Sequence, residues 1–294
     1  MKPYPFKYVR ADSLAAVFQQ FEEHGDDAQI LAGGQSLMPV LNMRLSAPRV
    51  LVDINAIEEL HGIALDGGEV RIGALTRHRE VLESEIVQAH LPLLAEAMPH
   101  VAHVAVRNCG TLGGSLALAD PAAEMPACAV ALGATLLLRS AAGERTVAAE
   151  DFYQGLYETE RRPDEVLTEA RYPIARPGYH SAFQEFARRQ GDFPVVGVAA
   201  RGRVERGVLS ELRLVYFGCE GHARLARLAA LAAEAGGRPY TPQVFAALKD
   251  ALAQELDPME NMHGCRATKL HMAQVLTGRA LLALVARAEG VVHG

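Results

Sequence analysis

The residues of this chain best suited to bind an anion lie in two short segments that each pair two glycines with a serine. They are "AGGQS" at residues 32–36 and "TLGGS" at residues 111–115. Glycine lets a ligand approach the backbone where a Cβ would block it, and successive N–H groups in such a turn can surround an anion. Ser36, Thr111 and Ser115 can add hydroxyl donors. Two such loops from distant parts of the chain suit a diphosphate better than a single phosphate.

The residues alone also allow these loops to have no ligand. Each glycine pair can be no more than a tight turn after a strand. Neither loop matches G-x-G-x-x-G or G-x-x-x-x-G-K-[ST], so a Rossmann crossover or a P-loop is not predicted. The segment "GGSLA" at 113–117 lacks the second glycine of the G-x-S-x-G nucleophile elbow, which disfavours acyl transfer.

Two further pairs of residues are weaker candidates for chemistry. His100 and His103 are three residues apart and could share a helix face as metal ligands, but no carboxylate or cysteine beside them completes a set. We expect them to be solvated residues at a helix end and predict no metal site. Arg161 and Arg162 lie in a polar segment, which we expect them to keep solvated.

Composition narrows the class of protein. The chain has 294 residues, of which 50% are hydrophobic, with a net charge of -6, so nucleic acid and anionic membranes are not expected partners. No apolar run is long enough to span a bilayer, and the start shows no export signal. The four cysteines are widely spaced, which argues against disulfides and iron–sulfur ligation in this chain. We expect a cytoplasmic location.

The hydrophobic pattern predicts the elements that hold these loops. Ser13 can cap a helix that Gly25 ends, and Ser36 can open another after a strand at 28–31. Thr76 can cap a helix over 77–84. Further helical patterns cover 86–100 and 122–134, and further strands are predicted at 49–55, 70–76 and 135–140.

After a polar segment with three prolines, the pattern changes near Pro177, where we place a domain boundary. Three alternating segments, 181–189, 194–207 and 208–218, predict three antiparallel strands joined by glycine-containing turns. Helical patterns follow over 222–236, 241–256 and 267–288.

Three segments together resemble the FAD-binding medium subunit of molybdenum hydroxylases, a family that includes the flavoprotein subunits of carbon monoxide dehydrogenase and xanthine dehydrogenase. They are "AGGQSL", "VRNCGTLGGSLALADPAAEMPA" from Val106, and "RRQGDFPVVGVAA" from Arg188. "VLVDIN" and "VRIGALTRH" also match, so the resemblance covers nearly the whole chain. The second of the three segments is long and specific.

The resemblance implies an α+β fold in two domains. Residues 1–176 would form a two-subdomain FAD-binding fold of the PCMH (vanillyl-alcohol-oxidase-like) type. Residues 177–294 would form a smaller α+β domain with a three-stranded antiparallel sheet. It also implies a complex in which a molybdopterin large subunit oxidises the substrate and an iron–sulfur small subunit with 2Fe–2S clusters relays electrons to this FAD. FAD then passes them to an external acceptor, in a dimer of heterotrimers.

The same resemblance places the cofactor contacts. The first loop would face the diphosphate from one side and the second from the other, Glu124 would hydrogen-bond the polyol chain, Phe193 would lie near the flavin ring, and Leu167 would contact the ring or the adenine. No catalytic residue is implied, because binding and tuning of the flavin are the protein's tasks. The implied cofactor-binding residues are Ala32, Gly33, Gly34, Gln35, Ser36, Leu37, Thr111, Leu112, Gly113, Gly114, Ser115, Glu124, Leu167 and Phe193.

The chain departs from the family pattern at Leu118, where histidine is common, and at Cys109, where arginine is common. Neither change removes a backbone contact, although Leu118 could alter polarity beside the cofactor. Two other functions remain open: a stand-alone FAD-dependent oxidoreductase of the same fold, and a non-catalytic assembly subunit with a decayed nucleotide site. The substrate and the electron acceptor are not determined by the sequence.

Overall fold

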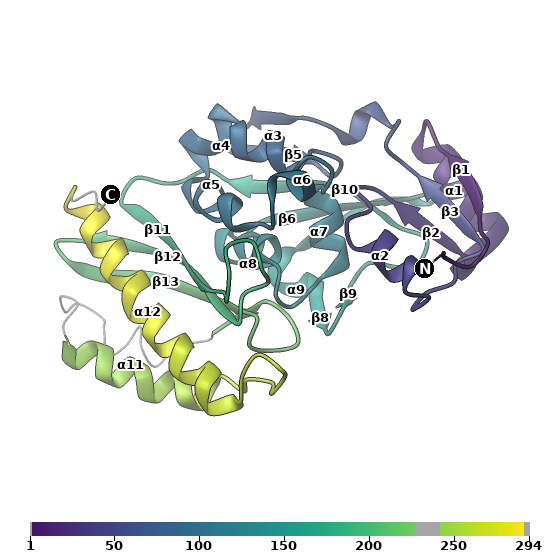
Figure 1. Ribbon diagram of the computed structural model, residues 1–294. Helices are drawn as coiled ribbons and strands as arrows, with labels where there is room; N and C mark the ends of the chain where they lie inside the picture. Colours follow the sequence, from purple (N-terminus) through teal and green to yellow (C-terminus); the bar gives the residue numbers. More distant parts are fainter. Residues whose placement is uncertain (1, 227–241, 291–294) are drawn as a thin grey trace.

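The computed structural model describes residues 2–226 and 242–290 (Figure 1). The helix expected over 222–236 therefore lies largely outside the described residues. Its described beginning is not helical, because Arg224–Leu225 forms strand β14. Among the described residues, no helix combines the length and apolarity that a membrane crossing requires.

A small parallel sheet carries the first glycine loop. Its strands lie in the order β1-β3-β2, with bounds β1 Lys7–Arg10, β2 Ala28–Leu31 and β3 Val50–Asp53. Helix α1 (Leu14–His24) begins at Ser13, whose hydroxyl accepts from the Ala16 N–H, and Gly25 ends it, as predicted. The short helix η1 (Gly25–Asp27) follows. The first glycine loop leaves the edge strand β2 and leads into helix α2 (Leu37–Asn42), whose N-cap is Ser36.

A five-stranded sheet in the order β4-β5-β10-β6-β7 carries the second loop. Its bounds are β4 Ile63–Asp66, β5 Glu69–Gly73, β6 Thr135–Ser140, β7 Gly143–Ala148 and β10 Val166–Pro173. The central strand, β10, lies within the polar segment for which the sequence predicted no strand. The strand reads as polar because its residues alternate: Ala170 and Tyr172 are buried in the core, while Glu169 and Arg171 face outward.

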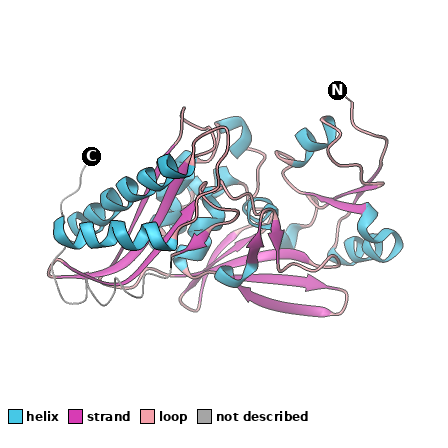
Figure 2. Ribbon diagram, turned by 90° about the horizontal axis from the view of Figure 1, so that it is seen from below, coloured by secondary structure: helices cyan, strands magenta, loops and turns pink. Residues whose placement is uncertain are grey.

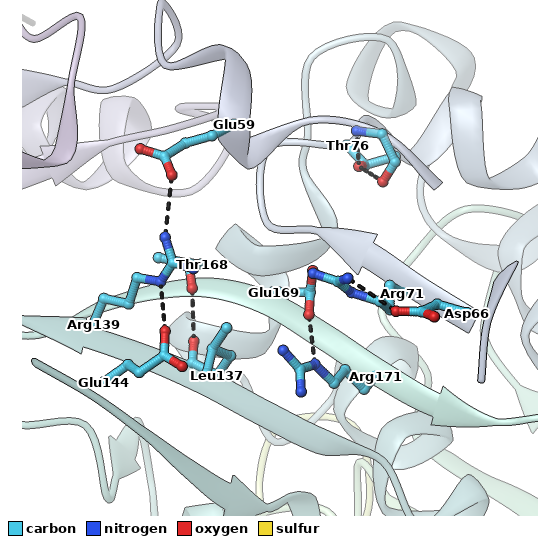
Figure 3. A network of polar contacts seen from close by, with 11 residues as sticks. Glu59, Asp66, Arg71, Thr76, Leu137, Arg139, Glu144, Thr168, Glu169 and Arg171 are labelled. Atoms are coloured by element: carbon cyan, nitrogen blue, oxygen red, sulfur yellow. Dashed lines mark hydrogen bonds and ion pairs between the residues drawn. The ribbon is translucent and has the colours of Figure 1, made fainter. Parts of the chain in front are cut away.

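The outward face of this sheet carries charged side chains that join its strands (Figure 3). Glu169 on β10 accepts from Arg71 on β5, at 2.8 Å, and from Arg171, at 2.6 Å. Arg139 on β6 donates to Glu144 on β7 and to Glu59 in the short helix η2 (Glu58–Leu60). Such half-exposed pairs contribute little individually and serve mainly to keep this face solvated.

Short helices cover the inner face of the same sheet. Leu91 and Pro92 break the helix predicted over 86–100, because proline is readily accommodated at the first turn of a new helix. The helix predicted to be capped by Thr76 instead begins after Arg77, since the Thr76 hydroxyl is bonded to the backbone of Gly62. The bounds are α3 His78–Glu83, α4 Glu85–His90, α5 Pro92–Ala97, η3 Met98–His100, α6 Val104–Arg107, α7 Leu112–Leu118 and α8 Glu124–Leu132.

A short connection follows β7 before the chain enters β10. It consists of a single helical turn and a two-stranded hairpin. The bounds are α9 Ala149–Phe152, β8 Tyr153–Gly155 and β9 Glu158–Thr159.

The C-terminal sheet has four antiparallel strands, not the three that the sequence predicted. The order is β11-β12-β13-β14, and the extra strand β14 pairs Arg224 with Tyr216 and Leu225 with Val215. At two residues, β14 is too short for an alternating pattern to reveal it. The other bounds are β11 Tyr179–Phe186, β12 Val196–Glu205 and β13 Val208–Phe217.

Both faces of this sheet are covered (Figure 2). Val198 and Tyr216 belong to the core shared with helices α11 (Pro242–Glu255) and α12 (Arg266–Ala288), whereas Ala199 and Phe217 pack into the core around α8. Period-two alternation thus faces one set of side chains to each layer. Helix α8 is buried along its whole length, which fits its apolar sequence.

Candidate functional site

One cavity of about 510 Å³ lies where the two glycine loops meet the segment 191–193 between β11 and β12. Thirteen of the fourteen residues that the sequence singled out line it. They are Ala32, Gly33, Gly34, Gln35, Ser36, Leu37, Thr111, Gly113, Gly114, Ser115, Glu124, Leu167 and Phe193. The fourteenth, Leu112, is fully buried in the core beneath the second loop and does not line the cavity.

The first loop offers free backbone donors. In the described part of the chain, the five consecutive N–H groups of residues 33–37 have no acceptor. Side-chain amides hydrogen-bond two carbonyl groups of the loop. The Asn55 amide donates to the Ala32 carbonyl at 2.9 Å, and the Gln35 amide donates to the Gly33 carbonyl at 2.9 Å. Gly34 has a φ of +70°, which glycine adopts without strain. The loop is therefore suited to surround an anion with N–H groups.

In the second loop, four of the five backbone N–H groups donate to acceptors within the described protein, and only that of Thr111 does not, which differs from the expectation that both loops would present their N–H groups to a ligand. The Leu112 N–H donates to the Thr76 carbonyl and the Gly113 N–H to the Ala74 carbonyl, each at 2.9 Å. Thr111 takes the next two, because its hydroxyl accepts from Gly114 at 3.1 Å and its carbonyl from Ser115 at 3.1 Å. Thr111 and Ser115 line the cavity, and their hydroxyls are the further polar groups of this loop.

Glycines bring the two loops into contact. A Cβ on Gly33 would lie 2.4 Å from the Cys109 carbonyl oxygen and 2.8 Å from the Gly110 Cα. A Cβ on Gly113 would lie 2.4 Å from the Ala74 Cβ. The lack of a side chain at Gly33 and Gly113 is thus required by packing of protein against protein, a role that the sequence pattern did not distinguish from ligand approach.

Arg77 ties the two loops together and was not singled out by the sequence. Its guanidinium donates to the Asn55 side chain at 2.6 Å and also to the Cys109 carbonyl. Asn55 in turn holds the first loop through Ala32, so one arginine fixes both loops. The only sequence signal for it is its place four residues after the end of strand β5, within "VRIGALTRH".

Two buried titratable side chains line the cavity. Burial raises the pKa of Glu124, the first residue of α8, to about 7, and the nearby Glu185 carboxylate also raises it. Burial lowers the pKa of His78 to about 4, and the positive charges of Arg107 and Arg77 act in the same direction. The His78 ring packs on Gly110, and its Nδ1 has no partner among the described residues.

The opposite wall comes from later parts of the chain. Leu167 on β10 is 5% exposed, whereas Phe193, in the loop before β12, is 65% exposed. Tyr157 donates to Asp120 at 3.3 Å. Arg161 also lines the cavity rather than solvating a loop, and its guanidinium donates to the Glu165 carbonyl at 2.8 Å.

The alternative chemistries find no support in this geometry. In the described residues, no histidine or carboxylate hydrogen-bonds the Ser115 hydroxyl, as a nucleophilic serine requires. His100 bonds Glu185 at 3.1 Å, and His103 packs against Gly191, so the two histidines do not converge. The described residues contain no group of three side chains arranged to hold a metal ion.

Two family models match the chain. Residues 4–175 match the FAD binding domain in molybdopterin dehydrogenase, and residues 181–284 match the CO dehydrogenase flavoprotein C-terminal domain. The chain belongs to the FAD-binding medium subunits of the molybdenum hydroxylases. As a member of this family it is a component of an oxidoreductase complex and has partner subunits.

Relatives of this medium-subunit family are similar over their full length. The caffeine dehydrogenase subunit beta of Pseudomonas sp. (strain CBB1) is 37% identical, over 100% of this chain and 98% of that protein. The carbon monoxide dehydrogenase medium chain of Hydrogenophaga pseudoflava is 36% identical, over 98% and 99%.

Solved structures agree with the family assignment. Carbon monoxide dehydrogenase from Hydrogenophaga pseudoflava superposes with a TM-score of 0.92 at 37% identity, covering 98% of this chain and 99% of that chain. Quinoline 2-oxidoreductase from Pseudomonas putida 86 superposes with a TM-score of 0.92 at 37% identity and covers 100% of both chains. The whole described fold is thus that of the medium subunits.

Proposed function

We propose that the cavity between the two loops holds FAD, with the diphosphate against the five free N–H groups of residues 33–37. That row of unpaired donors is the observation that carries the proposal. An anionic ligand satisfies donors that otherwise lack partners, and hydrogen bonds to a charged acceptor are stronger than those to a neutral one. The volume of about 510 Å³ is in the range of cofactor sites.

In this proposal the other residues that line the cavity contact different parts of the cofactor. The hydroxyls of Thr111 and Ser115 donate to the diphosphate from the second loop. Glu124 bonds the polyol chain, and Leu167 and Phe193 contact the ring systems. Residues 1–176 and 177–294 act as two domains with a boundary near Pro177, which the ends of the two family matches at 175 and 181 support.

FAD, when bound, supplies the two-electron redox chemistry, and this chain binds, orients and shields it. The electrons come from 2Fe–2S clusters of a small subunit, which receives them from a molybdopterin large subunit, in a cytoplasmic dimer of heterotrimers. They leave to an external acceptor. No residue of this chain is proposed as a catalytic acid, base or nucleophile. The two described loops with intact glycines favour a working flavin site over a decayed one.

A charge change at Ser36 tests the assignment of the first loop. Ser36 is the N-cap of α2, and its hydroxyl makes no capping bond. Asp and Asn serve equally well at this position, so Ser36→Asp and Ser36→Asn should fold alike. Only Ser36→Asp places a negative charge beside the diphosphate.

We expect the purified Ser36→Asn chain to retain flavin and the Ser36→Asp chain to lose most of it, measured as FAD released on denaturation per chain. Equal flavin in both variants would contradict the loop assignment. Assays for oxidation of NADH or of candidate substrates by the flavin-loaded chain without partners separate a subunit, which shows none, from a stand-alone oxidoreductase.

A further inference from the structure

Three side chains from separate elements form a cluster next to the cavity: Glu124 of α8, Glu185 of β11 and His100 of η3. The His100 Nδ1 lies 3.1 Å from one Glu185 carboxylate oxygen. The imidazole also packs on Phe183 at a centroid distance of 5.2 Å, which fixes its orientation. The second Glu185 oxygen is buried and has no partner among the described residues. An unpaired buried carboxylate oxygen is costly, so it calls for a function.

One residue of the cluster is exposed to solvent and the two carboxyl groups are buried. The His100 side chain is 43% exposed and that of Glu185 only 6%. Glu124 is 6% exposed, and it lines the cavity. His100 thus reaches solvent and is bonded to Glu185, while Glu124 faces the cavity and is close enough to both for their charges to act on it. Each of the three groups can carry a proton.

The protonation of the cluster depends on opposing effects on the pKa values of Glu124 and His100. Burial is the main cause that raises the pKa of Glu124 to about 7, while His100 acts to lower it. The hydrogen bond that the His100 ring donates to the Glu185 carboxylate raises the pKa of His100, against the effect of burial. A carboxyl group with a pKa near 7 changes its protonation readily when the charge beside it changes.

Other charged groups face the cluster from the neighbouring elements. Asp120 on the cavity wall raises the pKa of Glu124, and Glu96 on α5 raises the pKa of His100. Glu96 is itself paired with Arg287 of α12 at 2.6 Å. Burial keeps Cys128, one turn along α8, in its neutral thiol form by raising its pKa. These groups set the charge that surrounds the three cluster residues.

We propose that Glu124, Glu185 and His100 form a proton-exchanging cluster that takes up a proton from solvent when negative charge enters the cavity. The inference rests on the proposed function, because the charge is that of two electrons delivered to FAD by the partner's 2Fe–2S cluster. The Glu124 carboxylate then gains a proton and becomes a carboxylic acid. The proton passes from the His100 imidazolium through Glu185, and solvent reprotonates His100. When the electrons leave for the acceptor, Glu124 returns the proton.

The physical reason is electrostatic. Added negative charge in a poorly solvated cavity favours the neutral form of a neighbouring carboxyl group. With a pKa of about 7, Glu124 is roughly half protonated at pH 7, so reduction can add on the order of half a proton there. This uptake comes in addition to any proton bound by the cofactor itself.

Proton uptake on reduction of the FAD-loaded chain tests the cluster. Pulsed photoreduction in weakly buffered solution with a pH indicator gives protons bound per two electrons. Near pH 7 we expect Glu124→Gln to bind roughly half a proton less than the unsubstituted chain. Asp192→Asn is the matched control, because Asp192 lines the same cavity but is exposed, and its uptake should equal that of the unsubstituted chain.

His100→Phe separates a role in proton exchange from a merely structural role. Phenylalanine keeps the ring on Phe183 but removes the charge that lowers the pKa of Glu124. We expect the pH of greatest extra uptake to move upward and the uptake to become slower.

Infrared spectra of the flavin-free chain should show a carboxylic acid that titrates near pH 7 and is missing in Glu124→Gln.

The outcomes distinguish the two proposals. A chain that binds flavin but shows equal uptake with and without Glu124 overturns the proton-exchanging cluster and leaves the proposed function standing. If the unsubstituted chain folds but binds no flavin, the proposed function is wrong, and the inference that rests on it is wrong as well. An infrared band in Glu124→Gln identical to that of the unsubstituted chain also overturns the cluster.

Discussion

The two glycine loops look alike in sequence but differ in what their backbones do. Residues 33–37, in the first loop and at the start of α2, leave five consecutive N–H groups without acceptors in the described chain, whereas four of the five N–H groups of residues 111–115 have acceptors. The difference arises from what lies beside each loop. The first follows the edge strand β2, while the second runs antiparallel to the segment after β5, where Arg77 pairs with Thr111.

This comparison shows that a pair of glycines can serve two purposes. In the first loop Gly34 provides a positive φ that lets donors remain free, and in the second Gly113 lets the helix α7 start against Ala74. A ligand contact and a packing contact thus impose the same residue type. Substitutions in the two loops should therefore fail in different ways.

The largest effect is expected for Gly113→Val, which should lower the free energy of unfolding by about 3 kcal/mol or more. The added Cβ would lie 2.4 Å from the Ala74 Cβ and 2.7 Å from the Ala74 backbone. Urea unfolding of the flavin-free chain measures the loss. The comparison of the loops breaks down if Gly113→Val is as stable as Gly133→Val, a variant whose Cβ meets no atom within 4 Å.

The corresponding change in the first loop, Gly34→Val, should instead remove flavin. Its Cβ meets only the flexible side chains of Leu31 and Met38, at 3.2 and 3.3 Å. Gly133→Val is the matched control, since the φ values of +70° and +69° impose equal strain of about 1–2 kcal/mol. We expect both variants to remain folded, with a slightly lower unfolding midpoint for Gly34→Val because Leu31 and Met38 must move, but FAD only in the control. Full flavin in Gly34→Val would refute the loop's role.

A pH-dependent effect of similar size is expected at His78, behind the second loop. Its pKa falls from 6.5 to about 4 on folding, so the folded chain binds fewer protons than the unfolded chain in that interval. The stability contributed by the neutral ring is present above pH 6.5 and is lost as the pH falls to 4. Relative to His78→Phe, the unsubstituted chain should lose about 3 kcal/mol over this range.

Glu124 has the opposite sign over nearly the same range, because its raised pKa makes stability fall as the pH rises from 4.5 to 7. In the unsubstituted chain this effect opposes that of His78, so only the difference from His78→Phe isolates the histidine. A difference that stays constant between pH 4 and 6.5 would contradict burial of a neutral imidazole.

The smallest effect is expected at the hydroxyls that begin the two helices. Thr111→Val removes the acceptor for the Gly114 N–H and should cost about 1 kcal/mol, and Thr111→Ser should restore it. Ser36→Ala should change stability by only a few tenths of a kcal/mol, because the Ser36 hydroxyl makes no capping bond. Thermal unfolding of the flavin-free variants checks both, and equal losses would remove the distinction between the loops.

Much of the local structure follows from residue types alone. Ser13 and Gly25 bound helix α1 as predicted, and the alternation in β12 and β13 is readable because side-chain direction in a strand has a period of two. The two loops were found because glycine pairs beside hydroxyl residues stand out. The link to FAD came from the resemblance of the longer motifs, which the family matches confirm.

Long-range contacts decided what local patterns do not encode. Strand β10 reads as polar because one face is charged, and β14 is too short to show any period. The alignment of Glu124, Glu185 and His100 joins three elements far apart in the chain. The second loop likewise pairs with the segment after β5, which is distant in the chain. This pairing occupies N–H groups of the second loop, whereas the corresponding groups of the first loop remain free. The sequence by itself determined where glycines allow another group to approach the backbone and where hydroxyl groups can donate hydrogen bonds. Only tertiary packing decided which backbone N–H groups remain free to bind a ligand.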